Sequence, residues 1–255
     1  VYGTALIDEC IEDLKDYSED SIPVLDNENR LLGVITSASI VDLVDDEMGD
    51  DYAKLAGLTA EEDLKEPLKE SMKKRLPWLI ILLGLGMIVS SVVGVFEKVV
   101  TQLPIIMCFQ SLILDMAGNV GTQSLAVTIR VLMDESLTGK QKFELVLKEM
   151  HIGLCNGGLL GILSFVLIGL YIFIFKGRTL IFAYAVSGCI GLSLMVAMLI
   201  SCAVGTCIPL FFKKIHIDPA VASGPLITTI NDLVAVISYY GLSWIFLIEI
   251  MHMAG

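Results

Sequence analysis

Long uncharged stretches alternate with short charged ones over the last two thirds of the chain. A helix needs about 20 apolar residues to cross a bilayer core, and a charge at its centre is costly. Five stretches meet this requirement, two of them with one aspartate each: residues 76–96, 99–129 (with Asp115), 151–175, 179–212 and 219–248 (with Asp232). The pattern predicts five membrane-spanning helices. The fourth is longer than one crossing needs, so we expect it to bend near Pro209 or to lie partly at the membrane surface.

The first third of the chain has shorter apolar runs separated by polar ones. In order, they predict a helix around residues 7–14, a strand at 21–25, a polar turn at 26–30, a strand at 31–35 and a helix from about residue 37. We therefore expect a small α/β unit in front of the membrane part.

Charge separates these two parts of the chain. Residues 1–75 carry 20 of the 29 acidic and 8 of the 17 basic residues, a net charge of −12, whereas the remaining 180 residues carry nine of each. The mean hydropathy of +0.76 excludes an ordinary soluble enzyme. An acidic segment joined to a neutral apolar one argues against nucleic acid as a partner and favours cations.

The loops between the predicted spans differ in their content of lysine and arginine. With the amino-terminal segment in the cytoplasm, nine basic residues fall on the inner side and three, Lys98, Lys176 and Arg178, on the outer side. Cytoplasmic loops collect basic residues, so we expect a multi-pass protein of the cell membrane with its carboxy terminus outside. The chain begins at Val1 and shows no signal peptide, and we expect it to be part of a longer protein.

Asp232 has the more oxygen-rich surroundings of the two intramembrane aspartates. Gly224 and Pro225 lie about two helical turns before it, and a proline inside a helix frees a backbone carbonyl. Three further polar side chains are close in sequence: Thr228, Thr229 and Asn231. Carboxylate, carbonyl and hydroxyl oxygens suit a hard cation such as Mg²⁺, which keeps much of its water. The alternative is structural, because a protonated aspartate can also hydrogen-bond to a neighbouring helix.

The second span contains the polar sequence DMAGNVGTQS at residues 115–124. Its glycines bring helices close together, and Asp115, Asn119 and Thr122 offer oxygen atoms to a water-filled path. Glycine-mediated helix packing alone is the other interpretation of this motif.

Acidic residues crowd together just before the first span. The cluster includes Asp42, Glu47, Asp50 and Asp51, and it repels itself unless something neutralises it. It is either a solvated acidic face or a set of oxygen ligands for divalent cations. Residues 64–74 then predict a short connecting helix, acidic first and basic last, an order that suits the helix dipole.

The stretch SIPVLDNENRLLGVITSASIVDLV resembles the second half of a CBS domain, with the G-x-x-T segment at residues 33–36. CBS units work in pairs, so the resemblance implies a missing mate upstream. Many CBS modules hold a nucleotide ribose with an aspartate where this chain has Ser39. Adenine nucleotide is therefore expected only through that upstream unit.

The chain contains two motifs, GNVGTQS in the second span and DPAVASGPLITTINDL leading into the fifth, together with five spans and an acidic linker after a CBS unit. In these features it resembles the MgtE family of magnesium channels and transporters. The resemblance implies a transporter that is not an enzyme, a homodimer with its pore between the two copies, and Mg²⁺ as both substrate and regulatory ligand. Asp232 then holds hydrated Mg²⁺ at the selectivity site, with the backbone at Thr228 and Gly224. The remaining pore-lining residues are Asp115, Asn119, Thr122, Thr229 and Asn231. Ala117 departs from the family's usual glycine.

The same resemblance divides the chain into three parts. Residues 1–58 are a partial cytosolic CBS domain with an acidic tail, residues 59–75 a linker with a connecting "plug" helix, and residues 76–255 an all-α domain of five transmembrane helices. Four acidic residues fall on family positions that bind regulatory Mg²⁺ in the cytosol: Asp42, Glu47, Asp50 and Asp51. Mg²⁺ there draws the acidic parts together and closes the pore.

Two other functions remain open. A transporter of Co²⁺, Mn²⁺ or Ca²⁺ would use similar residues, although oxygen ligands disfavour softer metals. An intramembrane aspartyl protease would use Asp115 and Asp232 as a catalytic pair. Such proteases resemble one another in a Tyr-Asp and a Gly-x-Gly-Asp motif, and here Leu114 and Asn231 precede the two aspartates.

Overall fold

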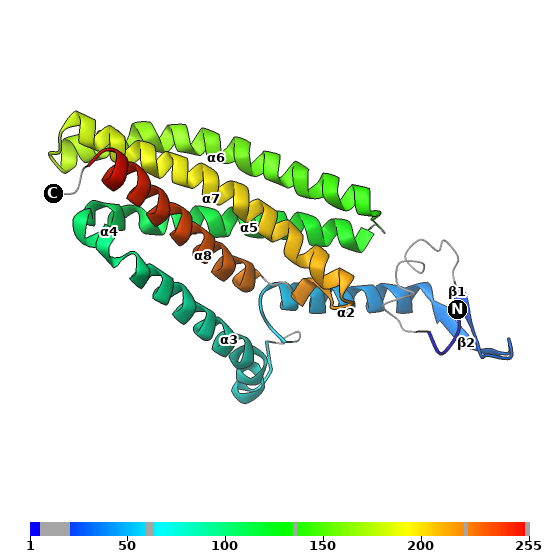
Figure 1. The fold of residues 1–255 in the computed structure, drawn as a ribbon. Helices are drawn as coiled ribbons and strands as arrows, with labels where there is room; N and C mark the ends of the chain where they lie inside the picture. The colour runs from blue at the N-terminus through cyan, green and yellow to red at the C-terminus, as the bar shows by residue number, and fades with distance from the viewer. Residues whose placement is uncertain (6–20, 60–63, 135–136, 222–223, 253–255) are drawn as a thin grey trace.

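The computed structural model describes residues 1–5, 21–59, 64–134, 137–221 and 224–252 (Figure 1). In chain order the elements are β1 (Ser21–Leu25), β2 (Leu31–Thr36), α2 (Ser37–Leu55), α3 (Leu68–Val95), α4 (Glu97–Gln102), the 3-10 turn η1 (Pro104–Ile106), α5 (Met107–Asp134), α6 (Gly139–Phe175), α7 (Leu180–Lys214), the 3-10 turn η2 (Pro219–Val221), α8 (Gly224–Ser243) and the π-helical η3 (Trp244–Ile250). The helix predicted around residues 7–14 lies outside the described part.

The α/β unit has the predicted strands. β1 and β2 pair antiparallel, with Ser21 opposite Thr36 and Leu25 opposite Leu31. The turn between them is held by Asp26, whose Oδ1 accepts hydrogen bonds from the backbone N–H groups of Glu28 and Arg30, each at 2.8 Å. α2 follows β2 directly, because the Thr36 side chain caps its first turn.

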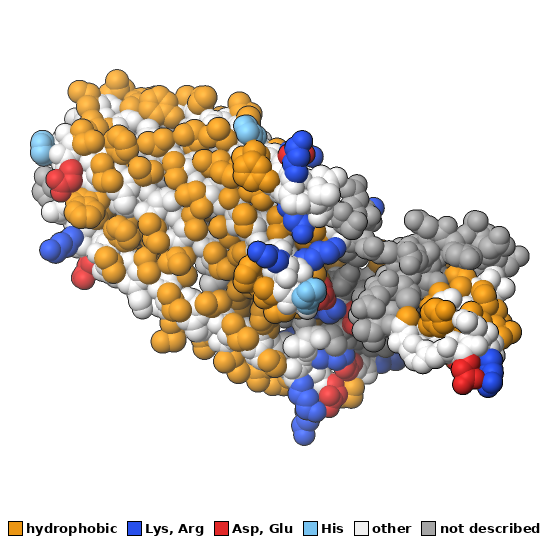
Figure 2. All heavy atoms as spheres, turned by 45° about the vertical axis from the view of Figure 1, so that its right-hand side comes forward, with side chains coloured by type: hydrophobic (Ala, Val, Ile, Leu, Met, Phe, Trp, Pro, Cys, Tyr) orange, Lys and Arg blue, Asp and Glu red, His pale blue; other side chains and the backbone are white. Residues whose placement is uncertain are grey.

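Five described helices are long and apolar enough to cross a membrane, which confirms the predicted membrane domain of five helices. Their limits are Leu68–Val95, Pro104–Leu132, Gly139–Phe175, Leu180–Lys214 and Gly224–Ile250. Figure 2 shows hydrophobic side chains over the visible side of the bundle and charged ones mainly toward its ends. Figure 1 places the hairpin and α2 at one end of the bundle and the carboxy terminus at the other.

Two spans begin earlier than their uncharged sequences do. α3 begins at Leu68, and α6 begins at Gly139 behind a capping box of Thr138 and Gln141. α7 continues through Pro209 to Lys214 as one helix. At 1.5 Å per residue its 35 residues reach about 52 Å, more than the hydrocarbon thickness of roughly 30 Å, so α7 tilts or extends beyond the hydrocarbon.

α7 is the central helix of the bundle and packs against α5, α6 and α8 (Figure 1). Its contact with α6 is made backbone to backbone. A Cβ built on Gly161 would lie 2.7 Å from the carbonyl oxygen of Gly191, and one on Gly157 would lie 2.8 Å from the Cα of Met195. Small residues let membrane helices approach this closely.

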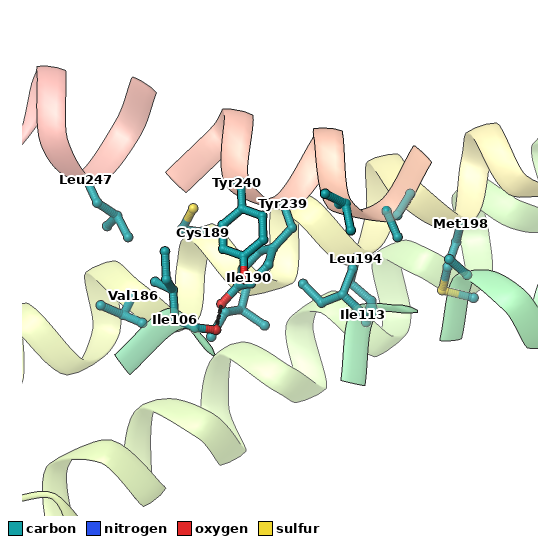
Figure 3. Close-up of a cluster of buried hydrophobic side chains, with 14 of the residues drawn as sticks. Ile106, Ile113, Val186, Cys189, Ile190, Leu194, Met198, Tyr239, Tyr240 and Leu247 are labelled. Atoms are coloured by element: carbon teal, nitrogen blue, oxygen red, sulfur yellow. Dashed lines mark hydrogen bonds between the residues drawn. The ribbon is translucent and has the colours of Figure 1, made fainter. Parts of the chain in front are cut away.

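The hydrophobic core lies where α5, α7 and α8 meet. Figure 3 shows Tyr239 and Tyr240 of α8 among Ile106, Ile190 and other apolar side chains. The Tyr239 hydroxyl donates a hydrogen bond to the carbonyl oxygen of Ile106 at 2.8 Å, so the buried ring keeps a partner for its polar group. The second half of α8 is thereby fixed against η1, just before α5.

α3 differs from the other spans, because it has no buried residue. It packs mainly along α8, and Figure 1 shows it leaning away from the rest of the bundle. Near its end, Phe96 stacks on Tyr240 with 5.6 Å between ring centroids.

A buried carboxylate joins α5 to α6. Glu149 of α6 is only 4% exposed, and its Oε2 accepts a hydrogen bond from the Ser124 hydroxyl of α5 at 2.9 Å. A buried carboxylate needs hydrogen-bond donors, so Ser124 reduces the cost of its burial.

We expect Gly161→Ala to lower the free energy of unfolding by about 1–3 kcal/mol, because the new methyl meets the backbone of Gly191. Gly158→Ala is the matched control, since no atom of the described residues lies within 4 Å of a Cβ there. Thermal unfolding in detergent, followed by circular dichroism, measures both. Equal melting temperatures for the two variants would contradict the close approach of α6 and α7.

Ser124→Ala should cost about 1–3 kcal/mol of stability, because it removes a hydrogen bond to a buried carboxylate. Ser193→Ala is the control. Its hydroxyl is also buried, but it donates to the carbonyl of Cys189 in its own helix at 2.8 Å. The same unfolding measurement decides, and a loss no larger than that of Ser193→Ala would show that Ser124 contributes little to holding Glu149.

Candidate functional site

The two sequence motifs lie on α5 and α8, and these helices pack against each other. Gly118 and Gly121 of α5 are the contact points. A Cβ on Gly118 would lie 3.0 Å from Cγ2 of Thr228, and one on Gly121 would overlap the amide of Asn231. The glycines of GNVGTQS thus receive side chains of the ITTIND segment.

On α5, Asp115, Asn119 and Thr122 fall at helical spacing along one face. Asp115 and Asn119 are exposed and Thr122 is half-buried. The Asp115 Oδ1 accepts a hydrogen bond from the Asn119 Nδ2 at 3.1 Å, and the Thr122 hydroxyl donates to the carbonyl oxygen of Asn119 at 2.9 Å. These residues form a continuous polar stripe in the middle of the span.

On α8, Thr228 and Asp232 are four residues apart and both are half-buried. Each threonine hydroxyl is bonded to its own helix: Thr228 donates to the carbonyl of Gly224 and Thr229 to that of Pro225, both at 2.9 Å. The structure differs from the expected proline break, because α8 begins at Gly224 and Pro225 lies in its first turn. Proline is well tolerated there, since the first N–H groups of a helix have no partner within it.

Asn231 differs from the expectation that it lines a pore. Its side chain is fully buried and lies against Gly121 of α5. Asp232 follows it in sequence but lies about 100° further around the helix, so it remains accessible.

The acidic cluster lies along α2. Asp42 is exposed and Asp50 is half-buried, whereas the side chains of Glu47 and Asp51 lie outside the described residues. Within the described residues, no group of three or more His, Cys, Asp or Glu side chains is arranged to hold a metal ion.

The end of α2 lies against the start of α8. Leu55 packs on a buried cluster of Leu125, Ile129 and Ile227. The Lys54 ammonium lies 2.7 Å from the Asp218 carboxylate, in the loop before α8. Gly57 follows with φ of +83° and fits between Trp78 and Pro225, where a Cβ would lie 2.6 Å from the Trp78 ring. The amino-terminal unit is thereby attached to both α3 and α8.

The connecting helix predicted for residues 64–74 is different in the structure. Helix begins only at Leu68 and continues without a break into the first span. Lys74 pairs with Glu66 at 2.8 Å and its carbonyl accepts a hydrogen bond from Thr59. The segment in contact with the start of α8 is therefore the end of α2 and the loop after it.

Sequence reasoning missed Glu149, the buried carboxylate that Ser124 holds. Glu149 lies just before the uncharged run at residues 151–175 and follows Lys140, Lys142 and Lys148. The available signal was helical spacing, since Glu149 lies four residues before Gly153 and eight before Gly157, on the face that packs against α7.

Comparison with known proteins places this arrangement in a family. The MgtE family model, described as a divalent cation transporter, matches residues 110–242, just over half of the chain. Proteins named magnesium transporter MgtE are similar to it: that of Enterococcus faecalis is 37% identical over 94% of this chain and 51% of its own length. Those of Bacillus subtilis (35%) and Thermus thermophilus (30%) each match over 89% of this chain and 48% of their own length.

The chain spans about half the length of the curated relatives it matches. The matched region of the family model contains α6, α7 and nearly all of α5 and α8, and with them Gly118, Gly121 and Asp232. The chain belongs to the MgtE family of divalent cation transporters.

Proposed function

We propose that this chain conducts Mg²⁺ through a pore formed between two copies of α5 and α8. The observation that carries the proposal is the packing of the two motif helices. Gly118 receives Thr228 and Gly121 receives Asn231, and Asp232 remains half-buried and accessible beside this contact. The relatives named magnesium transporters support Mg²⁺ as the ion.

Asp232 is the residue we propose to hold the ion. Mg²⁺ loses its water reluctantly and is commonly bound through one or two carboxylates with several waters retained. A single carboxylate from each copy, with the oxygens of Thr228 and Gly224 nearby, suits a hydrated ion. Transport of Co²⁺, Mn²⁺ or Ca²⁺ is the alternative, and the flux experiment below includes it.

A second copy is proposed because the polar stripe of α5 has to be shielded from lipid. Asp115 and Asn119 are exposed in the middle of a membrane span, and polar groups facing lipid are costly. Two-fold symmetry would bring the same stripes of two copies together around a water-filled path. Asp115, Asn119 and Thr122 would then line this path with Asp232.

The protease alternative has no support. Among the described residues, no hydrogen bond joins the carboxylates of Asp115 and Asp232, and Asp115 accepts instead from Asn119. The MgtE family consists of transporters.

The excess of basic residues in one set of loops supports the cell membrane with the α2 side in the cytoplasm. We propose that cytosolic Mg²⁺ regulates the pore from that side. Cations neutralising Asp42 and Asp50, with Glu47 and Asp51, would let α2 settle against the bundle, where Leu55 and Gly57 lie over the start of α8. Without them the acidic residues repel one another and α2 moves away.

Asp232→Asn should reduce Mg²⁺ entry at least about tenfold, because it removes the charge proposed to hold the ion. The chain is reconstituted in liposomes that contain a Mg²⁺-sensitive dye, and Ca²⁺, Mn²⁺ and Co²⁺ are offered in parallel. Glu249→Gln, at the far end of the fifth span, is the control and should leave entry unchanged.

Unchanged Mg²⁺ entry in Asp232→Asn would move the selectivity site away from α8. Entry of Ca²⁺, Mn²⁺ or Co²⁺ that equals or exceeds that of Mg²⁺ in the unmodified chain would overturn Mg²⁺ selectivity.

Millimolar Mg²⁺ on the α2 side should lower the flux, and the double variant Asp42→Asn with Asp50→Asn should weaken this inhibition severalfold. Glu28→Gln, on the exposed turn of the hairpin, is the matched control. Flux is measured in the same liposomes while Mg²⁺ on the α2 side is varied. Inhibition of equal strength in the double variant and the control would argue against α2 as the sensor.

A further inference from the structure

Asn231 combines full burial with a position next to the proposed ion-binding carboxylate. Its side chain is 0% exposed, and neither its Oδ1 nor its Nδ2 has a hydrogen-bond partner among the described residues. A buried amide in this state costs stability, whereas an apolar side chain of the same shape would not. Packing therefore holds Asn231, and its side chain lies against Gly121.

Gly121 cannot yield to Asn231, because α7 supports it from the other side. A Cβ on Gly205 of α7 would overlap the carbonyl oxygen of Gly121, so the two backbones are already in contact. α5 is thus held between Gly205 and Asn231, and any added volume at Gly121 has to be relieved on the α8 side, by the Asn231 side chain or by α8 itself.

A second contact fixes the position of α8 along α5. Gly118 and Gly121 are three residues apart on α5, as Thr228 and Asn231 are on α8, and each glycine receives one of the two side chains. Two such contacts define both the rotation of α8 and its position along α5. Asp232 follows Asn231 directly, so its direction is fixed by the same contacts.

We propose that Asn231 is a positioning residue: wedged against Gly121, it sets the rotation of α8 and thereby the direction of the Asp232 carboxylate. This inference rests on the proposed function for its consequence on ion selectivity. The steric contact itself can be tested by stability alone.

The test is a double-mutant cycle on the 255-residue chain. Gly121→Ala should lower the melting temperature in detergent by roughly 3–10 °C, because the methyl overlaps the Asn231 amide. Asn231→Ala removes the overlapping atoms, so the double variant should melt higher than Gly121→Ala alone. Gly241→Ala, on α8 like Asn231, is the control, since within the described part of the chain nothing lies within 4 Å of a Cβ built there. A double variant that is no more stable than Gly121→Ala would overturn the contact.

Ion flux distinguishes a role of Asn231 in directing Asp232 from a role in packing alone. Gly121→Ala and Asn231→Ala should each reduce the ratio of Mg²⁺ to Ca²⁺ entry by about tenfold, because the Asp232 carboxylate is then misplaced relative to the ion. Asn231→Leu keeps the branched shape and should keep the ratio. If Asn231→Leu behaves like Asn231→Ala, or if Asn231→Ala changes only stability, positioning by shape is wrong. If the unmodified chain carries no Mg²⁺, the proposed function fails while the stability cycle still decides the contact.

Discussion

The close approach of helix backbones at α7 is the constraint on which the rest of the molecule depends. Lipid tails are as apolar as the side chains they surround, so helices in a bilayer gain little from hydrophobic burial and associate mainly through packing. α7 meets α6 at Gly161 and Gly191 and meets α5 at Gly205 and Gly121. With α5 and α7 joined in this way, α8 packs against both of them.

The sequence was sufficient for the broad architecture, because two strong patterns produce it. Uncharged runs of adequate length predict the five spans, and a polar turn between alternating runs predicts the hairpin. The ends of the spans were harder to predict from the sequence. Lys140, Lys142, Lys148 and Glu149 interrupt the apolar run, yet α6 continues through them, because a helix extends past the hydrocarbon wherever its own hydrogen bonds and a good cap support it.

For the candidate site, composition selects residues but not the direction in which their side chains point. Asp232, Thr228 and Asp115 were selected because oxygen-bearing side chains are rare in an apolar run, and their role in binding stays a prediction. The same argument included Asn231, which the structure buries, because composition does not specify which face of a helix a residue occupies. Pro225 was placed inside a helix, and only the structure distinguishes an interior proline from one in the first turn. The contacts of Gly118 and Gly121 could not be predicted, because the sequence does not say which helix packs against them.

The lack of buried residues on α3 has a consequence for how the chain is assembled during synthesis. A helix that is apolar on every side enters the bilayer without help from later segments. α5 is the least apolar of the five spans, and the hydroxyl of its buried Ser124 donates to Glu149 of α6. The first span is therefore able to anchor the nascent chain, while Ser124 of the second lacks this partner until α6 has followed.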